Sequence, residues 1–344
     1  MNPGAALPRR RLGRTGLALP VLGLGGAPLG DLYARLDEGV AQDTVAAAVA
    51  AGLTFLDTAP LYGHGLSEHR IGAGLRRARD PTVVLSTKVG RVLEPSRGGH
   101  DREGYAGGLP FAARFDYSRD GALRSLEDSL RRLGRARIDV ALIHDIDRRT
   151  HGAAFEARFT EAMAGAYPAL AALRDEGVVG AIGIGVNEAE VAARFLAEAD
   201  LDAVMLAGRY TLLEQGALDA LLPLAEARGA GVLLAGIYNS GILATGARAG
   251  ATYDYRAADP AVLDRVARIE RVCASHGTAL ADAALAFALA HPAVTVAVLG
   301  AVSPDEVVRN RASLDAVIPA GLWSDLRAEG LLRPDAPIPA GAAT

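Results

Sequence analysis

Short apolar runs alternate with longer helical patterns along almost the whole chain. Strands that all run in one direction need a crossover between them, usually a helix, so this alternation predicts βα units around a parallel sheet. Eight such units close the sheet into a barrel. We therefore expect an α/β fold, a (β/α)8 TIM barrel, with strands at residues 21–25, 54–57, 82–87, 139–143, 181–185, 203–207, 231–235 and 294–299.

The composition fits one large domain and argues against several kinds of partner. The chain has 344 residues, of which 50% are hydrophobic and 22% charged, so we expect a single domain over residues 1–344. The formal net charge of −4 predicts binding to neither nucleic acid nor an anionic membrane. Cys273 is the only cysteine, which favours a reducing, cytoplasmic setting. We expect a small molecule as partner, and a monomer or a homodimer.

Two connections are too long for simple turns. They cover residues 89–116 and 145–167, and both follow the C-terminal ends of expected strands. Such connections overhang the mouth of a parallel barrel, where active sites lie. We interpret them as long loops that contact the substrate. The barrel core is expected at about residues 12–318, and the segment 331–344, rich in Pro and Ala, as an arm on the surface.

Asp57, Tyr62, Lys88 and His144 each stand at or just past the end of an expected strand. Parallel strands end on the same side of a barrel, so these side chains can converge. Together they would form a tyrosine acid/base beside a lysine that an aspartate holds, with a histidine to orient the reacting oxygen. This set suits hydride transfer at a carbon–oxygen bond. The histidines within residues 62–69 fit no recognised ligand spacing, so no metal is expected.

The order of these four residues, each in its strand context, resembles the aldo-keto reductase superfamily, and the resemblance runs from about Leu12 to Asn310. It implies a hairpin over residues 11–20 that plugs the bottom of the barrel. It also implies a nicotinamide cofactor that lies extended across the mouth. Gly25, Gly26 and Asp57 are assigned to the cofactor site on this basis, although no dinucleotide fingerprint of the G-x-G-x-x-G type follows the first strand.

Two further segments resemble the cofactor-binding parts of this family. Asn187 matches the asparagine that bonds the nicotinamide amide, although it is equally suited to be a helix N-cap. Ala207 stands where many relatives have a glutamine for the same amide. Tyr238 matches a tyrosine that stacks on the nicotinamide ring, and a packed tyrosine in a strand-to-helix turn is the alternative. The residues expected near the pyrophosphate are Asn239, Ser240, Gly241 and Leu243.

The last strand and the helix after it indicate which cofactor is used. Relatives that prefer NADP carry a lysine, a serine and an arginine at the positions of Gly300, Ala301 and Glu306. A 2′-phosphate needs cationic partners, which these residues do not supply, so the resemblance implies NAD rather than NADP. Val302 belongs to the same contact segment, and Asn310 is expected near the adenine.

Within the superfamily, residues 205–215 and 238–243 resemble NAD-linked aldose dehydrogenases. That branch includes L-fucose (D-threo-aldose) 1-dehydrogenases, L-galactose dehydrogenases and pyridoxal 4-dehydrogenases. The implied reaction is oxidation of an aldose hemiacetal at C1 to the lactone, with Tyr62 and His144 against the substrate. Arg209 is a further candidate for substrate contact, or else forms a salt bridge. Pyridoxal oxidation, NADP(H)-dependent carbonyl reduction and a non-catalytic cofactor sensor are the alternatives.

Overall fold

A computed structural model of the protein describes residues 6–98 and 103–339. Within it, eight parallel strands follow one another around a closed barrel, and the last pairs with the first. Every expected strand is present, so the prediction of a TIM barrel is confirmed. The barrel strands are β3 (Leu22–Gly25), β4 (Phe55–Asp57), β5 (Val84–Val89), β8 (Ile138–His144), β9 (Val179–Val186), β10 (Ala203–Ala207), β11 (Gly231–Ala235) and β14 (Val294–Gly300).

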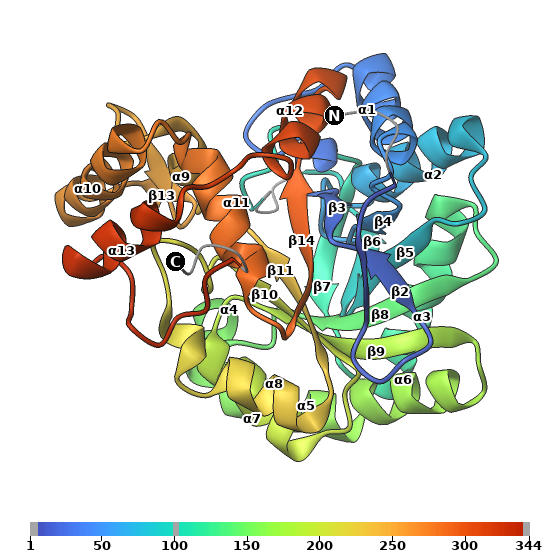
Figure 1. The fold of residues 1–344 in the computed structure, drawn as a ribbon. Helices are drawn as coiled ribbons and strands as arrows, with labels where there is room; N and C mark the ends of the chain where they lie inside the picture. The colour runs from blue at the N-terminus through green and yellow to red at the C-terminus, as the bar shows by residue number, and fades with distance from the viewer. Residues whose placement is uncertain (1–5, 99–102, 340–344) are drawn as a thin grey trace.

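Helices surround the barrel (Figure 1). They are α1 (Glu38–Ala50), α2 (Leu66–Ala78), α3 (Arg119–Leu133), α4 (Arg148–His151), α5 (Phe155–Ala164), α6 (Ala166–Asp175), α7 (Ala189–Glu198), α8 (Leu221–Arg228), α9 (Ile242–Thr245), α10 (Pro260–Ser275), α11 (Leu280–Ala290), α12 (Pro304–Ser313) and α13 (Ala320–Ala328). Within the described residues no single helix has the length and apolarity to cross a membrane. Only α10 and α11 taken together, with a bend of 97° between them, have the required composition.

The barrel strands are apolar on both faces, because one face packs in the barrel interior and the other packs against the surrounding helices. In β14, Val296 and Val298 point into the barrel, whereas Ala297 and Leu299 belong to the layer between strands and helices. This alternation follows from the two-residue period of a strand. The sequence therefore shows continuous apolar runs rather than an alternation of apolar and polar residues.

The N-terminal hairpin closes the bottom of the barrel. β1 (Arg9–Arg11) pairs antiparallel with β2 (Ala18–Pro20). Leu12, just after β1, and Leu19, within β2, are fully buried in the barrel interior. The expected plug is confirmed. These two leucines fill the end of the barrel opposite the mouth.

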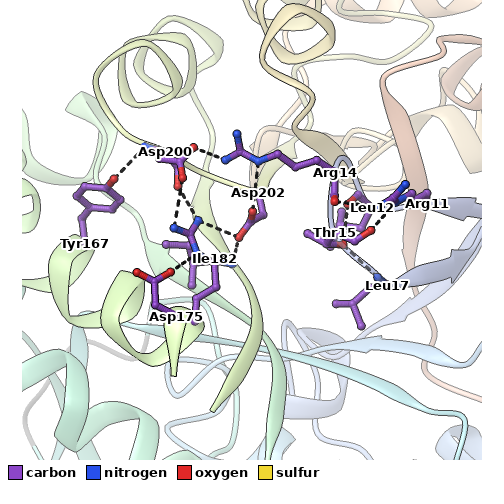
Figure 2. Close-up of polar contacts among 11 residues, drawn as sticks. Arg11, Leu12, Arg14, Thr15, Leu17, Tyr167, Asp175, Ile182, Asp200 and Asp202 are labelled. Atoms are coloured by element: carbon purple, nitrogen blue, oxygen red, sulfur yellow. Dashed lines mark hydrogen bonds and ion pairs between the residues drawn. The ribbon is translucent and has the colours of Figure 1, made fainter. Parts of the chain in front are cut away.

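An ionic network holds the tip of this hairpin against the strand ends (Figure 2). Arg14 pairs with Asp200 and lies 3.8 Å from Asp202, measured from Nε to Oδ1. Arg174 Nη1 is 3.3 Å from Asp202 Oδ2, which also accepts a hydrogen bond of 3.0 Å from the Ile182 amide. The network therefore joins the hairpin to the beginning of β10 and to β9.

The two long connections carry secondary structure of their own in the parts that the structure describes. The first carries the antiparallel hairpin of β6 (Arg91–Pro95) and β7 (Phe111–Phe115). The second contains α4, α5 and the start of α6. A second small hairpin, β12 (Thr252–Tyr253) with β13 (Arg256–Ala257), follows β11 and α9.

The C-terminal segment is not a surface arm as far as the structure describes it, to residue 339. Leu331, Leu332 and Ala336 are buried in the main hydrophobic cluster. Gln215 clamps the segment, because its Nε2 donates to Leu331 O at 3.0 Å and its Oε1 accepts from Arg333 N at 2.8 Å. The two leucines supply the apolar surface that favours docking, and the packed core extends beyond residue 318. Residues 340–344 lie outside the described part.

Candidate active site

Four predicted residues meet at the mouth of the barrel. Asp57 ends β4, Lys88 lies near the end of β5, and His144 ends β8. Tyr62 stands in the turn between β4 and α2. Because the three strands are parallel and adjacent, their C-terminal ends bring these side chains together, as expected.

Lys88 and Asp57 form a buried ion pair. Lys88 Nζ is 2.7 Å from Asp57 Oδ2 and donates a second hydrogen bond, of 2.8 Å, to Thr58 O. Ser86 Oγ donates to the other carboxylate oxygen at 2.9 Å. Burial raises the pKa of Asp57, an effect that Lys88 and Ser86 oppose. The pair thus fixes the ammonium group beneath the mouth.

Tyr62 lies between this pair and His144. Its ring centroid is 4.6 Å from Lys88 Nζ and 5.9 Å from the His144 ring centroid, with the two rings at 82°. Burial, followed by the charges of Asp57 and Asp145, raises the pKa of Tyr62 well above its usual value. Burial is the largest of these causes, and Asp57, which pairs with Lys88, acts in the same direction. The phenol is therefore protonated at neutral pH.

His144 is neutral in this structure. Burial and the charges of Lys88 and Arg91 lower its pKa well below the usual value. Its Nδ1 is buried and has no hydrogen-bond partner in the described part of the chain, whereas Nε2 is 3.5 Å from Asp145 Oδ1. We infer that the proton is on Nε2, since a nearby carboxylate favours an N–H that faces it. The ring then offers a donor to the mouth.

Sequence reasoning assigned no role to Arg91 and Asp145, which lie beside this set. Arg91 Nη2 is 2.6 Å from Asp145 Oδ2, and its Nη1 is 2.8 Å from Glu103 Oε1. Each stands within two residues of the end of a barrel strand. A charged residue directly beyond a barrel strand is the signal that would have drawn attention to them.

Asn187 is held by hydrogen bonds from both its side chain and its backbone, and its side chain also bonds Tyr255. Its Nδ2 donates one long hydrogen bond, of 3.4 Å, to Ala207 O. Its backbone N–H donates to Asp147 Oδ2 at 3.1 Å. The alternative role as a helix cap is not observed, because α7 has Glu188 as its N-cap residue.

The turn after β11 contains three consecutive residues in the left-handed region: Asn239, Ser240 and Gly241, with φ values of 45°, 59° and 97°. Asn239 is buried, and its side chain bonds Gly208 O at 3.0 Å and Thr211 Oγ1 at 2.6 Å. Leu243 is fully buried. Their side chains therefore build the turn, and Ser240 Oγ also accepts a hydrogen bond of 3.0 Å from Tyr255 N.

Gly300, Glu306 and Asn310 come together at the end of β14. Glu306 Oε2 accepts a 2.9 Å hydrogen bond from Val302 N, and Asn310 Nδ2 donates to Gly300 O at 3.3 Å. Gly300 is exposed, whereas Ala301 is buried. The N-terminus of α12 thus presents an acidic side chain.

The two glycines after β3 differ. Gly25 lies opposite Asp57 in the pairing of β3 with β4. Gly26 is enclosed, because a Cβ there would lie 2.6 Å from Ser67 Oγ and 2.7 Å from Asp57 O. Gly26 is therefore required for packing beside the mouth, and Gly25 is the more accessible of the two.

Arg209 forms the salt bridge that was one of its two expected roles. Its Nη2 is 2.9 Å from Asp254 Oδ1, and the same carboxylate pairs with Arg149. Asp254 lies in the turn between β12 and β13, so both arginines hold this hairpin.

Comparison with known proteins identifies the family. The model of the aldo/keto reductase family matches residues 21–328. A pyridoxal 4-dehydrogenase of Microbacterium luteolum is 40% identical over 335 residues, which cover 94% of this chain and 98% of that protein. A D-threo-aldose 1-dehydrogenase of a Pseudomonas species is 38% identical over 330 residues, covering 93% and 96% respectively. The holo form of an aldo-keto reductase from Bacillus halodurans matches with a TM-score of 0.73 at 25% identity, over 98% of this chain and 100% of that one. The chain belongs to the aldo/keto reductase family, and it is an oxidoreductase of that family.

Proposed function

We propose that this protein is an NAD-dependent aldose 1-dehydrogenase, which oxidises the cyclic hemiacetal of an aldose at C1 to the lactone. The observation that carries the proposal is the position of Tyr62 between the buried Lys88–Asp57 pair and a neutral His144. A substrate hydroxyl at this point would lie beside a proton acceptor (Tyr62), a hydrogen-bond donor (His144) and a fixed cation (Lys88). The four residues together have the roles that hydride transfer at a carbon–oxygen bond needs.

The residues of this chain handle the proton. In the oxidation, the anomeric O–H bond breaks and its proton passes to the oxygen of Tyr62, which must be in its phenolate form. Lys88 is the cation that stabilises this phenolate, with its ammonium 4.6 Å from the ring centroid. His144 Nε2–H holds the same substrate oxygen in place. A bound nicotinamide cofactor supplies the acceptor for the hydride that leaves C1.

The residues around the mouth fit such a cofactor, and members of the family use nicotinamide cofactors. The Asn187 amide makes a long hydrogen bond from its Nδ2 to Ala207 O and a contact with Tyr255, and the side chain of Tyr238 is only partly buried. Apart from the chain neighbours of Gly241, no described atom lies within 4 Å of the place that a Cβ there would take, so the turn is open at this point. Asn187 and Tyr238 would hold the nicotinamide, and Gly241 would lie at the pyrophosphate.

The acidic N-terminus of α12 supports NAD over NADP. Glu306 is bonded to the backbone at Val302, beside the exposed Gly300. A carboxylate there would repel a 2′-phosphate and accept hydrogen bonds from ribose hydroxyls. Arg309 is a nearby cation, and its Nη2 lies 3.7 Å from Glu306 Oε1. The carboxylate of Glu306 partly balances the charge of Arg309.

The likeness to a D-threo-aldose 1-dehydrogenase supports a sugar as substrate. Pyridoxal is the second candidate, because a pyridoxal 4-dehydrogenase is 40% identical over nearly the whole chain and pyridoxal also forms a cyclic hemiacetal. Both reactions would use Tyr62 in the same way.

The test is the formation of NADH or NADPH, followed by absorbance, with L-fucose, D-arabinose, L-galactose or pyridoxal. Tyr62→Phe removes the acid/base and is expected to abolish turnover. Tyr210→Phe is the matched control, since Tyr210 is buried and its hydroxyl has no partner among the described residues. Sugar turnover with NAD+ that depends on Tyr62 supports the proposal. Turnover of pyridoxal alone favours the second candidate, and turnover with NADP+ alone contradicts the interpretation of Glu306.

A further inference from the structure

Arg91 and Asp145 form a second buried ion pair at the mouth, outside the predicted set. Arg91 comes from the connection after β5 and Asp145 from the connection after β8. Only 3% of the Arg91 side chain and 14% of the Asp145 side chain are exposed. Arg91 also lies 4.3 Å over the Phe115 ring and pairs with Glu103 on its other side. The guanidinium is therefore held from three sides.

This arrangement fixes one oxygen of Asp145, while the other lies next to His144. Oδ2 accepts the 2.6 Å hydrogen bond from Arg91, whereas Oδ1 lies 3.5 Å from His144 Nε2, at the outer limit of a hydrogen bond. No other described residue hydrogen-bonds Oδ1. The negative charge of Asp145 also raises the pKa values of Tyr62 and Tyr105, two rings of the mouth. The carboxylate thus lies close to His144 and to the two tyrosine rings of the mouth.

The backbone of Asp145 is held in place as well. Its φ is 54°, in the left-handed region, and its N–H donates to Gly185 O at 2.9 Å. Aspartate tolerates this region better than most residues, but it remains uncommon outside glycine. A carboxylate with a fixed backbone and one fixed oxygen has little freedom left to lose when it binds a substrate.

We propose that Asp145 determines specificity by accepting a hydrogen bond from the hydroxyl on the carbon next to the reacting one, the C2 hydroxyl of an aldose. The inference rests on the proposed function. His144 Nε2 marks the position of the reacting oxygen, and Asp145 Oδ1 lies beside it. A vicinal hydroxyl is the donor that lies nearest to that oxygen in a sugar. A substrate without this hydroxyl leaves a desolvated carboxylate oxygen without a donor, which costs binding in the transition state.

The experiment compares D-arabinose with 2-deoxy-D-ribose, which has the same configuration at C3 and C4 but no C2 hydroxyl. The value of kcat/KM with NAD+ is measured for both sugars in the wild type, in Asp145→Asn and in Glu94→Gln. The asparagine keeps the shape of the side chain and an oxygen for Arg91, but offers an NH2 group in place of Oδ1. Glu94 is the control, because it pairs with Arg114 on the same connection in an exposed ion pair.

We expect the wild type and Glu94→Gln to prefer D-arabinose by about 10- to 100-fold, which is the range for a hydrogen bond to a charged group. In Asp145→Asn the preference is expected to fall to within about threefold, through loss of activity on D-arabinose. A purely structural role of Asp145 would lower kcat/KM for both sugars alike and keep the ratio, which would overturn the proposal.

The wild type alone provides a test that does not depend on folding of the variant. Equal kcat/KM for the two sugars in the wild type would overturn the role of Asp145 and leave the proposed aldose oxidation intact. Absence of turnover on all aldoses, with turnover of pyridoxal, would instead refute the proposed function, and the inference with it.

Discussion

Removal of Lys88 alone is expected to destabilise the fold strongly, while removal of Lys88 together with Asp57 is not. In Lys88→Met, the Asp57 carboxylate stays buried, at 3% exposure, with Ser86 as its remaining donor. Breaking one partner of a buried pair costs about 3–5 kcal/mol, whereas replacing both partners by apolar residues of similar volume is close to neutral. The free energy of unfolding of the double variant, Asp57→Leu with Lys88→Met, is therefore expected to lie within about 1–2 kcal/mol of the wild-type value.

Urea unfolding measures these free energies. Trp323 is the only tryptophan and is fully buried, so its fluorescence reports unfolding, and circular dichroism checks that both signals change together. The exposed pair Arg114–Glu94 provides the control, and Arg114→Met is expected to change stability little.

The pH dependence gives a second check on the same variant. Burial raises the pKa of Asp57, and without Lys88 nothing of comparable strength opposes this. The folded Lys88→Met variant then binds a proton at Asp57 more readily than its unfolded chain, so its stability is greatest at low pH and falls as pH rises through the folded pKa. A Lys88→Met variant as stable as the wild type, or a double variant as unstable as the single one, would refute this reasoning.

Three further outcomes are expected. Burial and neighbouring carboxylates raise the pKa of Tyr62, so its phenolate fraction rises with pH. The value of kcat/KM for oxidation should therefore increase from about pH 7 to pH 9 by up to tenfold per pH unit. A flat pH profile would contradict the role of this phenolate. Gly26→Ala should destabilise by about 1–3 kcal/mol in urea, because its Cβ would lie 2.6 Å from Ser67 Oγ, whereas Gly16→Ala, with no atom within 4 Å, should not. Asp202→Asn weakens the network in Figure 2 and should lower the free energy of unfolding by about 1–2 kcal/mol. Because Asp202 lies at the end of the barrel opposite the mouth, kcat should not change. A loss of kcat would argue against this separation.

The sequence predicts the barrel well because its signals are local and repeated. A continuous apolar run bounded by glycine or a polar residue predicts each strand, and the eight runs leave few ways to connect them. The hairpin plug is implied by the family resemblance, and the turn at Thr15 that places Leu12 and Leu19 in the barrel agrees with it. The convergence of Asp57, Lys88 and His144 follows in turn, because all parallel strands end on one side.

The chemistry of the site is less accessible from the sequence. The order of residues predicts that Lys88 lies near Tyr62 and is held by Asp57, but only the structure shows that burial raises the pKa of Tyr62. The assignment of Asn239 to the cofactor follows from the family resemblance of its segment, whereas in the structure its side chain bonds Gly208 and Thr211.

By itself, then, the sequence determined the fold class, the strands and the set of residues that gather at the mouth, because each depends on a short-range pattern. Only the tertiary structure decided that the long connections are folded, that Leu331 and Leu332 dock on the core, and that Arg91 pairs with Asp145. These last two residues are 54 positions apart, and no periodic pattern connects them. Their contact depends on how two separate connections pack over the barrel, and such packing depends on long-range burial and charge rather than on local sequence.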